Sequence, residues 1–172
     1  SRFKHILDID PLARSARLQP GVRNLAISES ARQYGLYYGP DPSSQIACSI
    51  GGNVAENSGG VHCLKYGLTT HNLLKVEMVT VEGDLITIGS EGLDSNGFDL
   101  MALITGSEGL LGVITEVTVK LLPSPEKAQV IMAAFDNVQT AGDAVGGVIA
   151  KGIIPAGLEM MDSPVIIAAE AF

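Results

Sequence analysis

Hydrophobic and polar residues alternate most regularly between residues 112 and 122. One side of the alternation carries Val113, Thr115, Val117 and Val119, and the other carries Ile114, Glu116, Thr118 and Lys120. This two-residue period predicts a β-strand, and Pro123 and Pro125 end it because proline has no N–H to give to a sheet. Similar runs predict strands over 3–8, 13–19, 73–81 and 85–88, the last two joined as a hairpin by the turn Glu82-Gly83-Asp84.

A period of three to four residues predicts helices elsewhere in the chain. Residues 24–35 carry one such pattern, with Asn24 as the expected N-cap, Gly35 as the stop, and Leu25, Ile27, Ala31 and Tyr34 on one face. We expect a short apolar helix over 98–104. Beyond Pro125 the pattern predicts a strand at 128–135, a helix at 137–151, a strand at 157–161 and a helix that begins at Asp162-Ser163-Pro164.

The sequence Pro123-Ser124-Pro125 is the best candidate for a domain boundary. We expect residues 21–122 to form one subdomain with a mixed sheet. Residues 126–172 are expected to leave that sheet as a separate strand–helix unit. Because the chain starts and stops within predicted elements, we expect it to be a fragment of a longer protein.

Residues 39–72 are rich in small and polar residues but carry few charges. Such a composition is typical of a loop that holds a ligand against its backbone. Three glycine-rich segments, 40–46, 51–60 and 105–114, expose backbone N–H groups that can bind a pyrophosphate without lysine or arginine. One such segment alone is explained by plain turns, whereas three in one mixed domain favour a ligand site. We therefore expect 39–60 and 105–114 to lie side by side.

Composition and charge exclude several classes of protein. Apolar residues are 46% of the 172, which is enough for a buried core, and the net charge of -8 disfavours nucleic acid as a partner. No apolar run reaches about 18 residues, so we expect no transmembrane segment. Cys48 and Cys63 are too few for a disulfide framework, and we expect both to be reduced thiols in the cytoplasm.

Motifs that carry catalytic groups are few. His5, His62 and His71 have no partner spacing for a triad or a metal site, so we expect His5 to be structural and the other two to make loop hydrogen bonds. The segment 106–109 is not a Gly-x-Ser-x-Gly elbow, and the Walker and Rossmann glycine patterns are missing. We expect no catalytic and no metal-binding residue in this chain.

Several motifs, taken together, resemble those of the FAD-linked oxidases of the vanillyl-alcohol oxidase/p-cresol methylhydroxylase (PCMH) superfamily. These motifs are Pro40-Asp41-Pro42-Ser43-Ser44, residues 50–60, Lys65-Tyr66-Gly67 and residues 105–116. The resemblance covers the whole chain in order and spacing. Within the superfamily it is greatest to the FAD-containing subunits of glycolate oxidases, near D-lactate dehydrogenases.

The resemblance implies an α+β fold, the second subdomain of a PCMH-type FAD-binding domain plus the start of an α+β cap domain. Residues 1–20 would be closing strands of the first FAD subdomain, 21–122 the second FAD-binding subdomain, and 126–172 the start of a truncated substrate cap. It also implies contacts with FAD at Pro40, Asp41, Pro42, Ser43, Ser44, Gly51, Gly52, Asn53, Ala55, Glu56, Asn57, Ser58, Gly59, Glu108, Gly109, Gly112, Val113 and Ile114.

The activity that the resemblance implies is oxidation of a 2-hydroxy acid, such as glycolate or D-lactate, by hydride transfer to FAD. The FAD site would be incomplete, because the family has its pyrophosphate loop upstream of Ser1 and its substrate-binding cap residues downstream of Phe172. Other oxidase subunits would be partners and would hold a cytoplasmic protein peripherally at a membrane.

Two alternatives remain open at this point. In the first, the isolated chain is an inactive FAD half-site or an interaction module, with self-association through the apolar surface that it exposes. In the second, the chain is a nucleotide-binding domain of an unrelated class.

Overall fold

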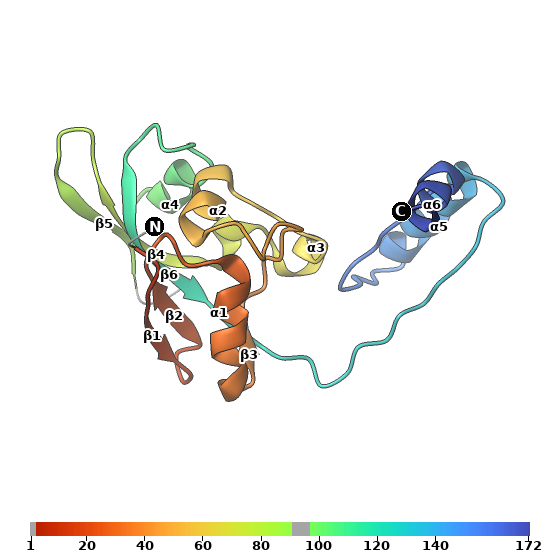
Figure 1. The fold of residues 1–172 in the computed structure, drawn as a ribbon, viewed down its shortest axis with the longest axis horizontal. Coiled ribbons are helices and arrows are strands. Elements are labelled where there is room, and N and C mark those ends of the chain that lie inside the picture. Colours follow the sequence, from red (N-terminus) through yellow and green to blue (C-terminus); the bar gives the residue numbers. More distant parts are fainter. Residues whose placement is uncertain (1–2, 91–96) are drawn as a thin grey trace.

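The computed structural model describes residues 3–90 and 97–172, and a five-stranded antiparallel sheet organises the first two thirds of the chain (Figure 1). The strand order in the sheet is β1-β2-β6-β4-β5. The bounds of these strands are Ile6–Asp10 for β1, Ser15–Leu18 for β2, Leu73–Val79 for β4, Leu85–Gly89 for β5 and Val113–Lys120 for β6. All five predicted strands of this part of the chain are confirmed within a few residues.

The prediction of a mixed sheet is wrong for the described residues. Strand β6 lies between β2 and β4 and runs opposite to both, and each of the two flanking pairs is also antiparallel. The outer pairs are hairpins, which join neighbouring strands by short turns and so impose opposite directions. In the β1–β2 turn, the Asp10 side chain accepts hydrogen bonds from the backbone N–H groups of Leu12 and Ala13.

The core of the domain lies between this sheet and helices α1, Asn24–Ala31, and α2, Ile50–Glu56. Val117 and Val119 of β6 are fully buried, as their alternation predicts. Ile27 of α1 and Ile50 and Val54 of α2 are also fully buried. A 3-10 turn over Arg32–Tyr34 follows α1, and the two-residue strands β3, Leu36–Tyr37, and β7, Leu122–Pro123, form a second small sheet beside it.

Asn24 does not cap α1, contrary to the sequence prediction. The N-cap is Arg23, which makes no side-chain cap bond. Asn24 is buried instead, and its Nδ2 donates a hydrogen bond to the Pro40 carbonyl at 3.0 Å. A buried amide must be paired, so this asparagine serves to anchor the 40–44 loop rather than the helix end. Gly35 ends the helical turn in the left-handed region at φ 68°, as predicted.

The segment 39–72 contains helical elements that its composition did not predict. They are α2, the short helix α3 over Cys63–Tyr66, and a 3-10 turn over Thr69–Asn72. Glycine lowers helix propensity, yet Ile50 and Val54 are four residues apart and both fully buried. The Ser49 side chain also accepts a hydrogen bond from the Gly52 N–H at 3.3 Å. Tertiary burial and capping therefore decide the helix where propensity opposes it.

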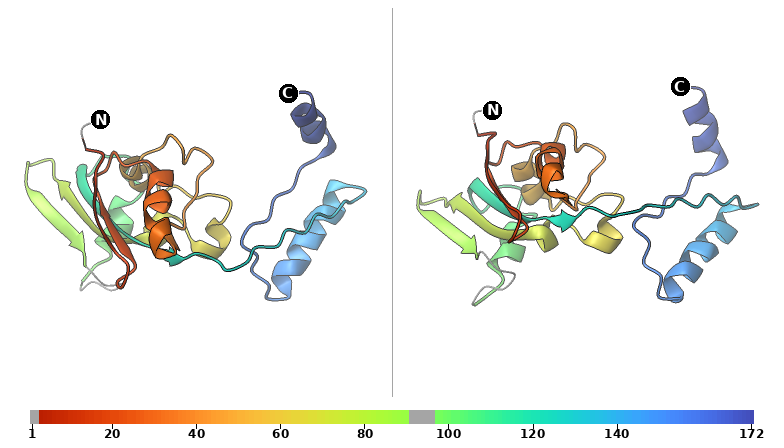
Figure 2. Two further views of the ribbon diagram at one scale, coloured as in Figure 1. Left: turned by 60° about the horizontal axis from the view of Figure 1, so that its bottom comes forward. Right: turned by 90° about the horizontal axis from the view of Figure 1, so that it is seen from below.

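Beyond β7 the chain leaves the sheet, and helices α5, Val138–Ala150, and α6, Ser163–Glu170, lie apart from it (Figures 1 and 2). Asn137 and Asp162 cap them through their side chains, as expected for the Asp-Ser-Pro start of α6. The strands predicted at 128–135 and 157–161 are wrong, since the structure has no strand there. A strand needs a hydrogen-bonded neighbour, and within the described residues none pairs with these segments.

The domain limits proposed from the sequence remain predictions. The hairpin of β1 and β2 pairs with β6, so residues 6–18 share one sheet with strands of the 21–122 segment in this structure. Strand β7 ends at Pro123, and residues 124–137 form neither helix nor strand. Helix α4, Leu100–Ile104, confirms the short apolar helix. None of the helices in the described ranges has the length and apolar character that a membrane crossing requires.

Tyr38 gives a test of the core. Its side chain is 2% exposed, and its hydroxyl has no hydrogen-bond partner among the described residues. Burial of the side chain raises the pKa of Tyr38. The unfolded phenol ionises near pH 10 while the folded one keeps its proton, so the free energy of unfolding falls as pH rises above about 10.

We expect Tyr38→Phe to unfold within about 1 kcal/mol of wild type at neutral pH, because an unpaired buried hydroxyl contributes no bond. The variant should also lose less stability than wild type above pH ~10. Denaturant titrations at neutral and alkaline pH measure both effects. Tyr38→Ala is the control and should lose about 3–5 kcal/mol. A Tyr38→Phe loss of similar size would show that the hydroxyl is bonded in the core.

Candidate functional site

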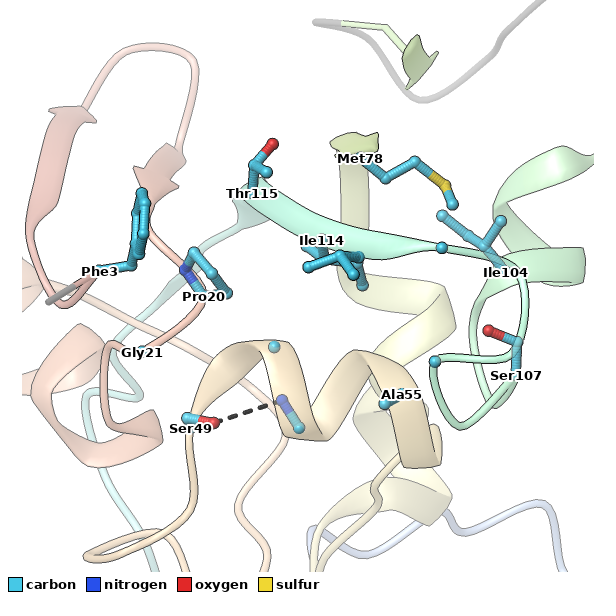
Figure 3. Close-up of a pocket in the computed structure, with 15 residues that line it drawn as sticks. Phe3, Pro20, Gly21, Ser49, Ala55, Met78, Ile104, Ser107, Ile114 and Thr115 are labelled. Carbon is cyan, nitrogen blue, oxygen red and sulfur yellow. Dashed lines mark hydrogen bonds between the residues drawn. The ribbon is translucent and has the colours of Figure 1, made fainter. Parts of the chain in front are cut away.

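A cavity of about 540 Å³ lies between α2, β6 and the turn that precedes β6 (Figure 3). Its wall carries no charged side chain and is mostly backbone, methyl groups and small polar groups. The lining residues are Phe3, Pro20, Gly21, Ser49, Gly51, Gly52, Ala55, Met78, Ile104, Ser107, Gly109, Gly112, Val113, Ile114 and Thr115. The cavity is within the size range of ligand sites and suits an uncharged, flat part of a ligand better than an ionic one.

Two backbone hydrogen bonds bring the walls of the cavity together. The N–H of Gly106 donates to the carbonyl of Val54 at 2.8 Å, and the N–H of Glu108 donates to the carbonyl of Ala55 at 2.9 Å. Both carbonyls belong to the last turn of α2, where a helix has few N–H partners for its C=O groups, and Val54 has only a long additional bond, from the Asn57 N–H at 3.4 Å. The prediction that 39–60 and 105–114 lie side by side is confirmed by these contacts.

The turn before β6 holds an unusual backbone. Gly106 has φ 84° and Gly109 has φ 78°, in the region that glycine adopts freely. Glu108 between them has φ 54°, which a residue with a side chain adopts only at a cost. Strain of this kind persists where surrounding contacts impose it, and here the Glu108 N–H is held by Ala55.

The two adjacent glycines of α2 have different roles. A Cβ on Gly51 would lie 2.6 Å from Pro20 Cβ, so Gly51 allows α2 to pack against the 20–21 turn. A Cβ on Gly52 would meet only Ser49 Oγ, at 3.3 Å, and one on Gly109 would meet no atom within 4 Å. These two glycines leave open space on opposite walls of the cavity, which lets a ligand approach the backbone.

Seven of the predicted FAD contacts line this cavity, and eleven do not. The seven are Gly51, Gly52, Ala55, Gly109, Gly112, Val113 and Ile114. The eleven outside the lining are Pro40, Asp41, Pro42, Ser43, Ser44, Asn53, Glu56, Asn57, Ser58, Gly59 and Glu108. The assignment of all eighteen residues to FAD stays a prediction.

Several of the residues outside the lining have other contacts. Asn53 is 2% exposed, and its Nδ2 is buried without a hydrogen-bond partner in the described chain. Asn57 Oδ1 accepts a hydrogen bond from the Thr70 N–H at 3.0 Å. The Ser58 carbonyl accepts hydrogen bonds from the backbone N–H and the hydroxyl of Thr69. These bonds brace the loop behind α2 rather than the cavity wall.

Eight lining residues were not predicted. They are Phe3, Pro20, Gly21, Ser49, Met78, Ile104, Ser107 and Thr115. Ser107 and Thr115 lie inside the recognised 105–116 motif, and Ser49 directly precedes the 50–60 motif, so proximity in sequence was an available signal. The cavity wall also includes Phe3, Met78 and Ile104, which come from separate elements that pack together. No local sequence pattern predicts these three residues.

A polar cluster lies outside the cavity lining, around Asp41 and His62. Asp41 Oδ2 lies 2.5 Å from His62 Nδ1, and the His62 ring centroid is 6.3 Å from that of Tyr66. Tyr37 packs edge-on against Tyr66, with ring centroids 6.1 Å apart. Burial, then the Tyr66 hydroxyl, then the Asp41 charge raise the pKa of Tyr37, so this phenol stays protonated at neutral pH.

The histidine and cysteine predictions can be compared with the structure. His62 pairs with Asp41, and His71 Nδ1 accepts a hydrogen bond from the Leu68 N–H at 3.1 Å, so both are loop hydrogen-bonders as expected. Cys48 and Cys63 are unpaired thiols. Within residues 3–90 and 97–172, no group of histidine, cysteine, aspartate or glutamate side chains is arranged to hold a metal ion.

Comparison with protein families gives two matches that together cover most of the chain. A model described as an FAD binding domain matches residues 1–89. A model described as the C-terminal domain of FAD linked oxidases matches residues 124–172. The boundary between the matches falls beside the Pro123-Ser124-Pro125 break.

Several relatives of the chain have names that refer to glycolate or D-lactate. The chain is 69% identical to glycolate oxidase subunit GlcD of Escherichia coli K12 over its whole length, which is 34% of that protein. It is 43% identical to GlcD of Bacillus subtilis over 99% of this chain and 37% of that protein. It is 32% identical to D-lactate dehydrogenase of Anaerostipes hadrus, with 36% of that protein covered. The chain thus spans about a third of the length of these relatives.

A solved structure supports the fold. Alkyldihydroxyacetonephosphate synthase superposes with a TM-score of 0.75 and 26% identity, over 91% of this chain and 28% of that one. The α+β fold inferred from the sequence, that of a PCMH-type FAD-linked oxidase, is therefore confirmed.

The two glycines of α2 generate a matched pair of variants. We expect Gly51→Ala to destabilise the fold by about 1–3 kcal/mol, because its methyl group overlaps Pro20. Gly52→Ala faces open space and should be within about 1 kcal/mol of wild type, with the gain in helix propensity offsetting the tight contact to Ser49. Thermal or denaturant unfolding measures both. Equal losses in the two variants would contradict the assigned roles.

Proposed function

Because the chain belongs to the FAD-binding-domain family of the FAD-linked oxidases, we propose that it is part of a flavin-dependent oxidoreductase that oxidises a 2-hydroxy acid. The substrate would be a small acid such as glycolate or D-lactate. The observation that carries the proposal is the cavity between α2 and the turn before β6, whose wall is uncharged and combines glycine backbone with apolar side chains.

The residues of the cavity fit the uncharged part of FAD. Open space above Gly52 and Gly109 allows a flat ring or a ribityl chain to lie against the backbone on both sides. Apolar groups of Ile114 and Met78 complete the wall, and Ser49 and Ser107 offer hydroxyl groups at its two ends (Figure 3). We propose that Gly51, Gly52, Ala55, Gly109, Gly112, Val113 and Ile114 contact the cofactor.

FAD, when bound, would supply the redox chemistry: it would take the hydride from the carbon that bears the hydroxyl group, while the hydroxyl proton is released, so that the acid becomes a 2-oxo acid. This chain would orient the cofactor and exclude water from the apolar side of the cavity. Its part in catalysis would be placement of the cofactor, which depends on rigid backbone rather than on titrating side chains.

The names of the relatives support the substrate class. Relatives that match 79–100% of this chain are named for glycolate, D-lactate and D-2-hydroxyglutarate oxidation. All three acids carry a hydroxyl group next to a carboxylate. We propose that the same unit is the substrate of the protein that contains this chain.

The proposal extends to partners, location and domains. GlcD is named as a subunit, which supports partner subunits for this protein. Two unpaired thiols support a cytoplasmic location, with association to a membrane through those subunits. The residue limits 1–20, 21–122 and 126–172 are proposed as closing strands of the first FAD subdomain, second FAD-binding subdomain and start of the cap.

The alternative, that the chain alone is an inactive half-site, is favoured by one observation. The cavity wall has no arginine or lysine and no charged group that would neutralise a pyrophosphate. The chain also spans only a third of its relatives. We propose that residues 1–172 by themselves bind FAD weakly or not at all and show no turnover.

The test uses the full-length reading frame that contains this chain, purified with FAD. We expect glycolate or D-lactate to bleach the visible flavin absorption band under anaerobic conditions. Acetate and propionate, which lack the hydroxyl group, are matched controls and should leave the band unchanged. An FAD-loaded protein whose band no 2-hydroxy acid bleaches would contradict the proposed function, and fast turnover by residues 1–172 alone would contradict the half-site.

Self-association of the isolated chain is a separate expectation. Val113 and Leu85 both pair with Val79 across the sheet and form an apolar row, and they are 68% and 61% exposed. Leu103 and Leu110 nearby in the chain are 61% and 85% exposed. Apolar surface of this extent favours association.

We expect sedimentation or light scattering of residues 1–172 to give a mass above that of the 17.9 kDa monomer. The double variant Leu85→Lys/Val113→Lys should shift the mass towards the monomer, because like charges in one row repel across the sheet. Val130→Lys, exposed in the segment beyond β7, is the control and should leave association unchanged. A wild-type chain that stays monomeric at high concentration would disprove this expectation.

A further inference from the structure

The Asp41–His62 pair lies in a motif that the cavity does not use. Asp41 Oδ2 lies 2.5 Å from His62 Nδ1, and Asp41 Oδ1 accepts a hydrogen bond from the His62 backbone N–H at 3.3 Å. One carboxylate thus holds the ring and the backbone of a residue that is twenty-one positions away. Neither residue lines the cavity between α2 and β6.

The Asp41 side of the pair is fixed to the core. The Pro40 carbonyl accepts a hydrogen bond from the buried Asn24 side chain at 3.0 Å. A Cβ on Gly60 would lie 2.4 Å from the carbonyl carbon of Asp41, so the backbones of the two loops are in direct contact. A displacement of residues 60–62 therefore has to move residues 40–42 as well.

The His62 ring has little freedom to change its position. Asp41 holds Nδ1 on one side, and Tyr66, one turn further along α3, lies 6.3 Å away between ring centroids. Lys65 Nζ lies 5.5 Å from the centre of the Tyr66 ring. The Asp41 carboxylate and the Tyr66 ring, on two sides of the His62 ring, favour one orientation of it.

The outer side of the same loop contacts the C-terminal segment. A Cβ on Gly157 would lie 2.9 Å from Val61 Cγ1, 3.4 Å from the Val61 carbonyl oxygen and 3.7 Å from His62 Cδ2. Gly157 is not among the glycines with positive φ, so its backbone conformation does not require glycine. The close approach of Val61 to this position is what favours glycine there. Figures 1 and 2 both show the chain between α5 and α6 turning back towards α3.

We propose that Val61 and His62 are the docking point for the C-terminal segment at Gly157, and that Asp41 and His62 are positioning residues which transmit this contact to the 40–44 loop. The occupant is a segment of the same chain, residues 155–158. Docking would hold His62, and the Asp41–His62 bonds would pass this restraint to the loop between Pro40 and Ser44, which would open less often. This coupling does not rest on the proposed oxidation of hydroxy acids.

Hydrogen exchange of the 172-residue chain, followed by mass spectrometry of its peptides, tests the coupling without any cofactor. Gly157→Gln adds a neutral side chain at the contact, and we expect exchange in peptides covering 60–67 and 39–45 to become about tenfold faster. Asp41→Ala alone should accelerate 39–45 by a similar factor. In the Asp41→Ala background, Gly157→Gln should add nothing further at 39–45, because the link is already lost.

Two matched controls accompany these variants. Gly147→Gln places the same side chain on α5, where a Cβ meets no atom within 4 Å, and should leave both peptides unchanged. Ser43→Ala alters the same loop at an exposed position and should also have no effect. Amides of β4 and β6 report global stability. If Asp41→Ala also accelerates exchange in β4 and β6, His62→Asn replaces Asp41→Ala in the single and double variants. His62→Asn keeps the backbone donor and removes the ring, and the same outcomes are expected.

Three results would overturn the proposal. Unchanged exchange at 60–67 in Gly157→Gln would show that the contact is not a docking point. Faster exchange at 60–67 with no change at 39–45 would show that the pair transmits nothing. An undiminished effect of Gly157→Gln on 39–45 in the Asp41→Ala background would show that the coupling takes another path.

Discussion

The hydrogen bonds from the backbone of Gly106 and Glu108 to the last turn of α2 are the contacts on which the candidate site depends. They use carbonyl groups of a helix end, where few N–H groups of the helix itself are available, so the turn completes the hydrogen bonding of α2. These bonds hold Glu108 at its positive φ, which is otherwise unfavourable, and they fix the spacing of the two walls of the cavity. The small residues on both walls are useful for binding only because this spacing is set.

The sheet supplies the rigidity behind that contact. Strand β6 starts directly after the turn, and its register with β2 and β4 fixes where the turn lies. Val117 and Val119 fill the core beneath, and Ile50 and Val54 of α2 pack into the same core. Both walls are therefore attached to one hydrophobic cluster, so a ligand that spans them would meet a surface formed before it binds.

Sequence patterns predicted the parts of the fold whose order is local. The alternation in β6 and the helical spacing of α1 are each contained in about ten residues, and both were confirmed within a few residues. Helix α2 was missed because its glycines oppose a helix, whereas the burial of Ile50 and Val54 in the core and the Ser49 cap decide it. The strand expected at 128–135 failed for the opposite reason. Its residues favour a strand, but none of the described strands pairs with it.

The candidate site was predictable to a similar degree. The glycine-rich motifs located both walls, because glycine permits tight turns and close backbone approach. They did not distinguish Gly52, which faces open space, from Gly51, which packs on Pro20, since that difference lies in the tertiary neighbours. Nor could they show that Asp41 pairs with His62 and lies outside the cavity lining, as this pairing depends on two loops folding against each other.

The most direct test of the central claim is a crystal structure of the full-length protein loaded with FAD. The account predicts that the uncharged part of the cofactor contacts Gly52 of α2 and Gly109 of the turn, with the Gly106–Val54 and Glu108–Ala55 hydrogen bonds intact. Electron density that places FAD elsewhere, with neither Gly52 nor Gly109 in contact with it, would contradict the account.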